Sequence, residues 1–280
     1  GLVQLMPDGA ADPTFYPAVH TNSVLAVKAL EDDRCMVGGS FRNVGSVPAI
    51  ASFELLEADG SVYWPFHRGS GANNFVDDLL VLPDNSILMA GYFSRYNGEA
   101  ARWMVRMLPD GERDPDWPAG TGPNGRVRGM VRLADGRLYI HGDFSSVDGV
   151  PRQRLARLLP NGHVDPTFDA GTGVEPSDFG VIRDIAAMDN GRLLIAGTFT
   201  TVQGTPRNGI ARLFFSGELE PNFYPQLLFD EGEPLVEAPF ELIDDNKVRA
   251  AVRGLEGELV DFARGRPVAA TEMAKGLIAE

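Results

Sequence analysis

The 280-residue sequence predicts an all-β fold built from repeats, and three observations lead to this prediction. The stretch 124–168 reappears about 51 to 55 residues away in both directions, which is the signature of a repeat architecture. Within each repeat, two β-rich runs flank a turn of the Asp-Gly or Asn-Gly kind, a strong hairpin signal because such turns need positive φ. Helical periodicity is absent from the same region.

Three columns recur from repeat to repeat. A Gly-x-Phe sequence ends the second β-rich run, and its phenylalanines follow one another at spacings of 52, 51 and 55 residues: Phe41, Phe93, Phe144 and Phe199. Seven residues beyond each stand Pro48, Ala100, Pro151 and Pro206. An Asp-Pro-x-aromatic corner begins at Asp12, Asp114, Asp165 and, weakened, Glu220, and it has decayed to 63–66 in the second repeat. We expect the Phe to pack between neighbouring sheets, and the Gly to permit close backbone approach or a bulge.

Each repeat is expected to supply a hairpin and one further strand. The predicted hairpins are 24–30 with 34–38, 76–82 with 87–90, 127–133 with 137–141, and 182–188 with 192–196. The predicted third strands are 50–56, 103–108, 154–159 and 209–214. A hairpin, one strand and a corner that can add a short fourth strand is the pattern of a propeller blade.

The two ends of the chain bear on how many blades form. Segment 2–6 matches 155–159, so the chain opens with the end of a repeat, as a processed or excised polypeptide does. A fifth hairpin is expected at 236–243 with 247–252, and 255–262 can add a strand. If 2–6 completes this last blade, a ring of five closes without free edges; the alternative is an arc cut from a larger ring. Residues 271–280 are predicted as a short helix, a docking tail or a disordered end.

The expected domain organisation follows from these repeats. A propeller domain spans 1–265, and a tail spans 266–280. Within the propeller, the repeats fall at about 1–23 (partial), 24–74, 75–125, 126–180, 181–234 and 235–265 (degenerate).

The amino-acid sequences of the repeats resemble a known family. The segments LLPNGHVDPTFDAGTG, VRLADGRLYIHGDF and FTTVQGTPRNGIARL are similar to the delta-60 repeat, a bacterial β-propeller module. The resemblance is strong over 2–223 and loose beyond it. It implies a propeller fold and a surface or secreted setting, and it carries over no catalytic residue.

Composition narrows the possible functions. The net charge is −14 and no basic stripe is visible, so binding to a nucleic-acid backbone is not expected. The acidity is interpreted as a source of solubility, and acidic loops that take up calcium are the alternative. The single cysteine, Cys35, lies on a predicted strand as a small buried hydrophobe. No apolar run is long enough for a transmembrane helix.

Local function is expected where the repeats differ. At the start of the first strand, one column reads Leu25, Asp77, Arg128 and Arg183, and the next reads Ala26, Asp78, Gly129 and Asp184. Innermost strands line the channel of a propeller, and alternation aims one column of each pair inward. The simpler interpretation is that these residues form a solvated channel wall. The more specific interpretation is that the charged residues of both columns form a small-ligand, cation or substrate site: Asp77, Asp78, Arg128, Arg183 and Asp184.

Other candidate sites carry weaker signals. The four histidines, His20, His67, His141 and His163, share no zinc-ligand spacing, and no nucleophile elbow or His-Glu-x-x-His motif occurs. Gly-Thr-Gly at 120–122 and 171–173 suggests a phosphate loop, but it recurs as a connector with no helix after it. Several aromatic residues at connectors can stack on sugars, anchor a partner or pack between blades: Tyr16, Trp64, Phe66, Tyr92, Tyr96, Trp117 and Tyr224.

These features predict a non-enzymatic propeller scaffold for protein–protein or glycan recognition. It would be a structural or adhesion component of an extracellular, cell-surface or virion assembly. Partners would bind through the connectors and the C-terminal tail, with no cofactor, nucleic acid or membrane insertion. The alternatives are a glycan-active lyase or glycoside hydrolase, with Asp77 and Asp78 as acid and base, and a calcium-dependent adhesion module.

Overall fold

The computed structural model describes residues 2–17, 23–30, 32–41, 43–44, 47–48, 52–66, 69–117, 121–175, 181–223, 240–244, 247–250, 259–261 and 266–268. All of the regular secondary structure in these residues is β-strand, which confirms the all-β prediction. The chain divides into two compact units. The first comprises Gly1–Pro151 with Arg157–Val164, and the second comprises Arg152–Ala156 with Asp165–Glu280.

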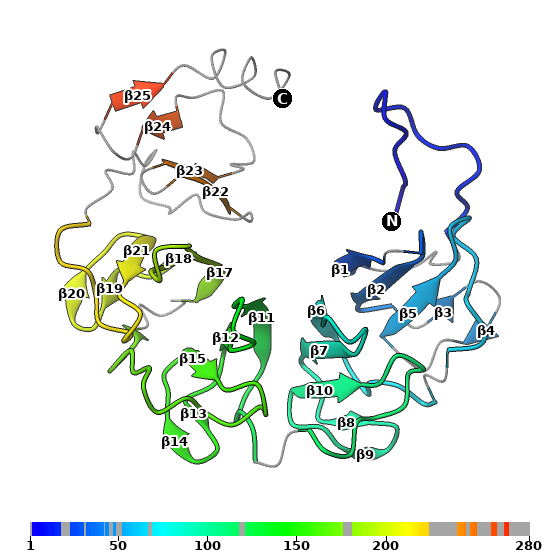
Figure 1. Ribbon diagram of the computed structural model, residues 1–280, viewed down its shortest axis with the longest axis horizontal. Coiled ribbons are helices and arrows are strands. Elements are labelled where there is room, and N and C mark those ends of the chain that lie inside the picture. Colours follow the sequence, from blue (N-terminus) through cyan, green and yellow to red (C-terminus); the bar gives the residue numbers. More distant parts are fainter. Residues whose placement is uncertain are drawn as a thin grey trace. The chain divides into compact units, whose positions relative to one another are not determined.

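Four three-stranded antiparallel sheets form the repeats, and in each the second strand lies in the middle (Figure 1). They are β1 (Val24–Ala29), β2 (Cys35–Gly39) and β5 (Phe53–Leu56); β6 (Val76–Val81), β7 (Ile87–Gly91) and β10 (Met104–Met107); β11 (Val127–Arg132), β12 (Leu138–Gly142) and β15 (Leu155–Leu158); and β17 (Ile182–Ala187), β18 (Leu193–Gly197) and β21 (Ile210–Leu213). The predicted hairpins and third strands are therefore confirmed. Their turns contain the expected left-handed residue, at Asp33, Asn85, Gly136 and Gly191.

A second, smaller hairpin follows each central strand, and the sequence did not reveal it. These hairpins are β3 (Asn43–Val44) with β4 (Val47–Pro48), β8 (Arg95–Tyr96) with β9 (Glu99–Ala100), β13 (Ser146–Val147) with β14 (Val150–Pro151), and β19 (Thr201–Val202) with β20 (Thr205–Pro206). The β8–β9 hairpin lies on the β10 side of its sheet (Figure 1). The connector from the preceding repeat pairs with three of these hairpins, through the bridges Ala72–Tyr96 and Pro123–Val147 and through β16 (Val174–Glu175) on β19.

The predicted fourth strand shrinks to one bridged residue in each repeat. The last part of each third strand turns back to form a single bridge: Leu56–Val62, Met107–Arg113, Leu158–Val164 and Leu213–Leu219. Segment 2–6, expected as a strand, forms only the equivalent bridge between Leu5 and Ala11. The strand expected over 2–6 is therefore not observed, because Leu5 is the one residue of this segment that forms a bridge. Closure of a ring by this segment stays a prediction.

Two further antiparallel strand pairs lie in the C-terminal region. Strand β22 (Phe240–Asp244) pairs with β23 (Lys247–Ala250), which confirms the fifth hairpin, and β24 (Leu259–Asp261) pairs with β25 (Arg266–Val268). The last of these strands begins where the tail was expected. The rest of the expected tail, residues 269–280, lies outside the described residues, as does Tyr224.

The recurring glycine and phenylalanine have a clear packing role. A Cβ atom on Gly39, Gly91, Gly142 or Gly197 would lie 2.0–2.2 Å from a backbone carbonyl oxygen at the start of the first strand. That carbonyl also accepts the N–H of the residue after each glycine, at 2.7–3.0 Å. The phenylalanines that follow are all fully buried. The close approach expected of the glycine is confirmed. The expected packing between sheets is observed for Phe93, which lies in one cluster with Phe53 and Leu55 of the preceding sheet.

The Asp-Pro corner is held by local and longer-range hydrogen bonds. The Oδ1 atoms of Asp12, Asp114 and Asp165 accept the N–H two residues later at 2.8–2.9 Å, which is an Asx turn. Asp114 also pairs with Arg106 of β10, with Nε and Oδ2 3.3 Å apart. The corner is thus a structural device that ties the turn to the third strand.

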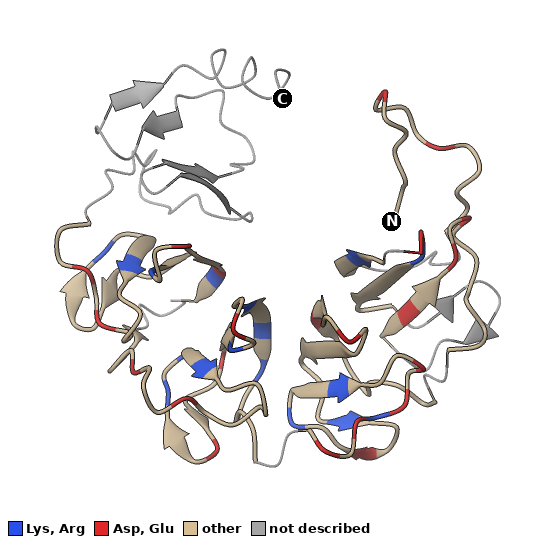
Figure 2. Cartoon of the chain, in the orientation of Figure 1, with Lys and Arg blue, Asp and Glu red and all other residues tan. Residues whose placement is uncertain are grey.

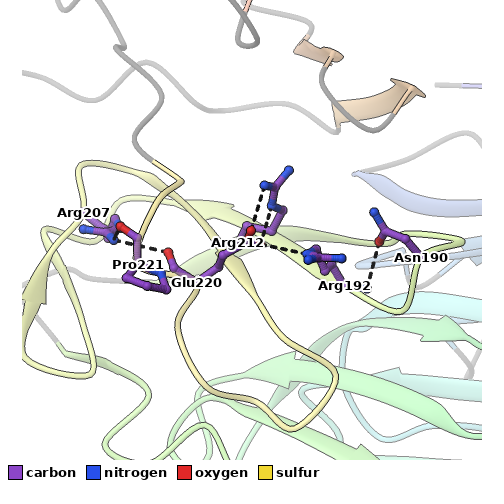
Figure 3. A network of polar contacts seen from close by, with 6 residues as sticks. All are labelled: Asn190, Arg192, Arg207, Arg212, Glu220 and Pro221. Atoms are coloured by element: carbon purple, nitrogen blue, oxygen red, sulfur yellow. Dashed lines mark hydrogen bonds and ion pairs between the residues drawn. The ribbon is translucent and has the colours of Figure 1, made fainter.

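In the second unit, Glu220 replaces the corner aspartate and binds two arginines (Figure 3). Arg212 of β21 donates from Nε to Oε2 at 2.7 Å and from Nη2 to Oε1 at 3.1 Å. Arg192 donates from Nε to Oε2 at 2.9 Å, while Asn190 accepts the Arg192 backbone N–H at 3.1 Å. The longer glutamate therefore joins the hairpin turn, the third strand and the corner.

Candidate functional site

Every first strand contains a β-bulge at the same place. The pairing register shifts between Val24 and Ala26, and at the equivalent points of β6, β11 and β17. The inserted residues are Leu25, Asp77, Arg128 and Arg183, the column in which the repeats differ. Bulges re-aim side chains and are common beside binding sites, so this end of the hairpins is the candidate site.

Asp77 forms a largely buried ion pair with Arg126 at this end of the hairpins. In the first unit β6 lies beside both β1 and β11, which brings the bulge of β6 close to the residue before β11, Arg126. Arg126 donates from Nε to Asp77 Oδ2 at 2.7 Å, and its Nη2 pairs with Oδ1. The Asp77 side chain is 9% exposed and that of Arg126 is 21% exposed. The hydrogen bonds that Arg126 donates to Asp77 raise the pKa of Arg126 against the opposing effect of burial.

Arg128 forms a second pair close to the first. Its Nε lies 3.0 Å from both carboxylate oxygens of Asp143, and its Nη2 lies 2.7 Å from Oδ2. The Asp143 charge also contributes to the raised pKa of Arg126. The bulge end of β6 and β11 therefore carries alternating charges, Asp77, Arg126, Asp143 and Arg128. Figure 2 shows the same interspersed signs along the described chain.

Two aromatic rings extend this charged group. The Arg126 guanidinium carbon lies 5.8 Å from the centre of the Tyr92 ring, and Tyr92 stacks on Trp103 with 5.3 Å between ring centres and 29° between planes. Tyr92 remains 46% exposed. We define the bulge-end cluster as Asp77, Tyr92, Trp103, Arg126, Arg128 and Asp143.

The backbone at Trp103 is strained. Trp103 has a φ of 72° and Arg102, before it, has a φ of 41°. The equivalent positions in the next two repeats are Arg154, with a φ of 62°, and Gly209, with a φ of 75°. The left-handed conformation therefore recurs at this point of the repeat, although it costs a non-glycine residue about 1–3 kcal/mol.

The remaining predicted site residues lie in two different settings. Asp78 accepts the N–H of Met130 on the neighbouring β11 and the N–H of Leu79, both at 2.8 Å, so it links adjacent strands. Arg183 and Asp184 lie on β17 in the second unit, where Arg183 is exposed and Asp184 accepts the N–H of Ile185 at 2.9 Å. The structure thus brings together Asp77, Asp78 and Arg128.

Sequence reasoning did not single out Arg126, Trp103 or Asp143. Asp143 occupies the middle of a Gly-x-Phe sequence, where the repeats read Ser40, Tyr92, Asp143 and Thr198. This position varies between repeats although the glycine before it and the phenylalanine after it recur, and that contrast could have identified Asp143 as a candidate. Nothing in the sequence indicated that Arg126 would reach the sheet of the preceding repeat.

Several other candidates have framework roles. The amides of Gly71 and Gly122 donate to the side-chain oxygens of Asn97 and Asp148 at 2.8 Å, so these connector amides already have acceptors. His141 is buried, and the described residues hold no group of three metal-ligating side chains. Of the aromatic residues, Phe66, Tyr96 and Trp117 are buried, whereas Tyr16, Trp64 and Tyr92 are exposed. Among the described segments, no helix has the length and hydropathy to cross a bilayer.

Comparison with solved structures gives several remote similarities. The gluconolactonase XC5397 from Xanthomonas campestris is 18% identical with a TM-score of 0.46, over 78% of this chain and 66% of that one. The extracellular domain of BT4673 from B. thetaiotaomicron, assigned to a hybrid two component system, is 13% identical with a TM-score of 0.46, over 81% and 25%. PorZ, a surface component of the type-IX secretion system of Porphyromonas gingivalis, is 11% identical with a TM-score of 0.42, over 76% and 30%. The chain spans less than two thirds of the length of each.

Comparison of sequences identifies the repeats. No curated protein sequence matches this chain. Residues 82–116, 133–168 and 189–223 match the family model described as domain of unknown function (DUF5122) beta-propeller. Each matched segment runs from a hairpin turn, through the third strand, to the corner. These three segments are therefore DUF5122 β-propeller repeats, and the three-stranded antiparallel sheets that contain them are consistent with propeller blades.

Proposed function

We propose that the protein is a non-enzymatic recognition module and that the bulge-end cluster is its contact surface. The observation that carries the proposal is the arrangement of this cluster. An exposed tyrosine, a stacked tryptophan and two arginines lie together at the ends of β7, β10 and β11, and these residue types are enriched in the energetically important centres of interfaces.

The charges of the cluster favour binding over catalysis. Asp77 and Asp143 are both engaged by arginines, and Asp78 accepts two backbone N–H groups. Because these carboxylates already accept hydrogen bonds from arginines and backbone N–H groups, they form fixed structural and electrostatic contacts. The acidic pair Asp77 and Asp78 is thus better suited to structure and recognition than to glycoside cleavage.

A protein partner fits the cluster better than a sugar. Sugar binding by stacking needs an open aromatic face, and the Tyr92 ring already contacts both Trp103 and the Arg126 guanidinium. The paired charges can select a complementary surface. We place the protein at a cell surface, in a secreted assembly or on a virion, on the basis of its resemblance to delta-60 repeats.

Site-specific photo-cross-linking tests this function. A benzophenone amino acid replaces Tyr92 in one variant and the similarly exposed Phe215 in a control variant, and both are expressed in the native host. Position 92 is expected to give a discrete protein adduct that Phe215 does not give. Adducts of equal yield at both positions, or none at position 92, would contradict the proposal. Specific signals on a glycan array, or turnover of glycan or lactone substrates, would overturn it in favour of a glycan-binding protein or an enzyme.

A further inference from the structure

The opposite end of the hairpins, where the Asp-Gly turns lie, contains two adjoining clefts in the first unit. The larger has a volume of about 730 Å³ and lies between the β1–β2 turn and the β6–β7 turn. The smaller, of about 250 Å³, lies between the β6–β7 turn and the β11–β12 turn. Leu82, Pro83 and Arg132 line both clefts. The larger volume is in the range of small-molecule sites.

The walls of the larger cleft combine apolar side chains with few charges. Leu30, Val81, Leu82, Pro83, Ile87 and Pro109 supply apolar surface. Its charged residues are Asp32, Arg34 and Arg132. Asp32 accepts the Nε–H of Arg34 at 2.8 Å, and the Arg34 guanidinium lies 4.1 Å from the centre of the Tyr63 ring. These two charges therefore offset each other.

Arg132, the last residue of β11, stands out from its surroundings. Among the described residues it makes no ion pair and no hydrogen bond through its side chain, although the chain carries a net charge of −14. In the smaller cleft, the neighbouring carboxylate of Asp84 is engaged by Arg106 and Ser86. Each cleft thus has one uncompensated positive charge, and it belongs to the same residue.

The repeat pattern shows that the fold does not need this arginine. The equivalent positions are Ala29, Val81 and Ala187, which are small and apolar. The turn residue beside it, Gly136, is glycine as in the last clear repeat, where it is Gly191, and an added Cβ at Gly136 would lie 3.7 Å from Arg132 Nη2. One repeat therefore replaces a small apolar side chain with a cation at the cleft.

We propose that this pair of clefts binds a carboxylate whose body is apolar, with Arg132 as the anchor of the carboxylate. A guanidinium donates two parallel hydrogen bonds to a carboxylate, and its unpaired charge selects an anion over a neutral analogue. Leu82, Pro83 and Pro109 contact the apolar body. The carboxylate belongs either to a small organic acid or to the C-terminus of a peptide.

The test uses sodium 3-phenylpropionate, its neutral analogue 3-phenylpropionamide, and a tetrapeptide with a free C-terminal phenylalanine. Binding to the whole chain is followed by ¹H–¹⁵N NMR, including the Arg132 Nε–H signal. The variants are Arg132→Ala, which installs the residue of two other repeats and so should fold, and Arg95→Gln, which removes the same charge from an exposed strand outside the clefts.

The acid is expected to shift the signals of Leu82 and Arg132 and to bind at least tenfold more tightly than the amide. Arg132→Ala should weaken acid binding at least tenfold, and Arg95→Gln should leave it unchanged. Tighter binding by the peptide than by the small acid would support the proposal and identify a chain terminus as the source. Equal affinity for acid and amide, unchanged affinity in Arg132→Ala, or no shift near Arg132 with any of the three probes would each overturn it.

Discussion

The corner of the last clear repeat allows a direct test of how its hydrogen bonds stabilise the second unit. Glu220 is 13% exposed, and it receives two hydrogen bonds from Arg212 and one from Arg192, at 2.7 to 3.1 Å. In the variant Glu220→Gln, the charge disappears and an amide N–H₂ group faces the donors of a guanidinium. The substitution should therefore loosen the second unit.

The magnitude follows from the number and the burial of these bonds. A hydrogen bond to a charged group contributes about 1.5–3 kcal/mol, and the two bonds from Arg212, which is 17% exposed, are the main loss. The bond from Arg192, which is 34% exposed, contributes less because solvent screens it. Since the glutamine keeps one acceptor, we expect the free energy of unfolding to fall by about 2–4 kcal/mol at pH 7.

The pH dependence has a definite sign. Burial alone raises the pKa of Glu220, but the hydrogen bonds and charges of Arg212 and Arg192 outweigh burial and hold the pKa below its ordinary value of 4.5. A carboxyl with a lowered pKa in the folded state stabilises the protein fully above its unfolded pKa. This stabilisation is lost as the pH falls through 4.5 toward the folded value. The difference between wild type and Glu220→Gln should therefore shrink as the pH is lowered from 6 to 3.

Hydrogen exchange read by mass spectrometry on peptides from 190–223 measures this stability locally. The matched control is Glu218→Gln, which makes the same charge change at an exposed side chain two residues away. The tryptophans Trp64, Trp103 and Trp117 all lie in the first unit, so their fluorescence follows that unit separately. Equal protection in Glu220→Gln, Glu218→Gln and wild type would refute the reasoning. So would a difference that stays constant down to pH 3.

Three further predictions concern the first unit. In Gly91→Ala the new methyl group would lie 2.2 Å from the Phe75 carbonyl oxygen. We therefore expect the free energy of unfolding, measured by urea denaturation, to fall by more than about 3 kcal/mol, and a decrease of less than about 1 kcal/mol would contradict the close approach. Phe144→Ala removes a buried ring and should lower the free energy of unfolding by about 3–5 kcal/mol in the same measurement. A variant as stable as the wild type would contradict the core position of this ring. A double-mutant cycle of Asp77→Ala and Arg126→Ala should give a coupling energy of about 1–3 kcal/mol, and additive effects would show that the pair contributes nothing.

The sequence predicted the hairpins well because the turn residues and the β-rich runs on either side of them indicate the same structure. Turns such as Asp135-Gly136 need a left-handed residue, and that requirement located the hairpins within one or two residues. The strand expected at 2–6 is replaced by a single bridge between Leu5 and Ala11, because a similarity in sequence to 155–159 does not by itself determine strand pairing. The small outer hairpins, such as β13–β14, escaped prediction because two-residue strands leave almost no alternation to detect.

The candidate site was predictable only in part, for a related reason. The bulge column was visible as the place where the repeats differ, and Asp77 and Arg128 lie in the cluster as expected. The partners of these residues come from elsewhere: Arg126 reaches Asp77 across 49 positions of sequence, and Asp143 meets Arg128 across a hairpin. The Asp77–Arg126 pair depends on the packing of one sheet against the next, and the Arg128–Asp143 pair depends on the side-chain direction set by the bulge of β11; no local sequence pattern encodes either.

The central claim is that the recurring columns fold the chain while the bulge-end cluster binds a partner. The most direct measurement is cross-linking from position 92 in the native host, with and without Arg128→Ala, alongside urea denaturation of the same proteins. The account predicts that Arg128→Ala lowers the adduct yield at least fivefold and changes the free energy of unfolding by less than about 1 kcal/mol, as for an exposed ion pair. An undiminished adduct, or one lost only because the variant unfolds, would contradict it.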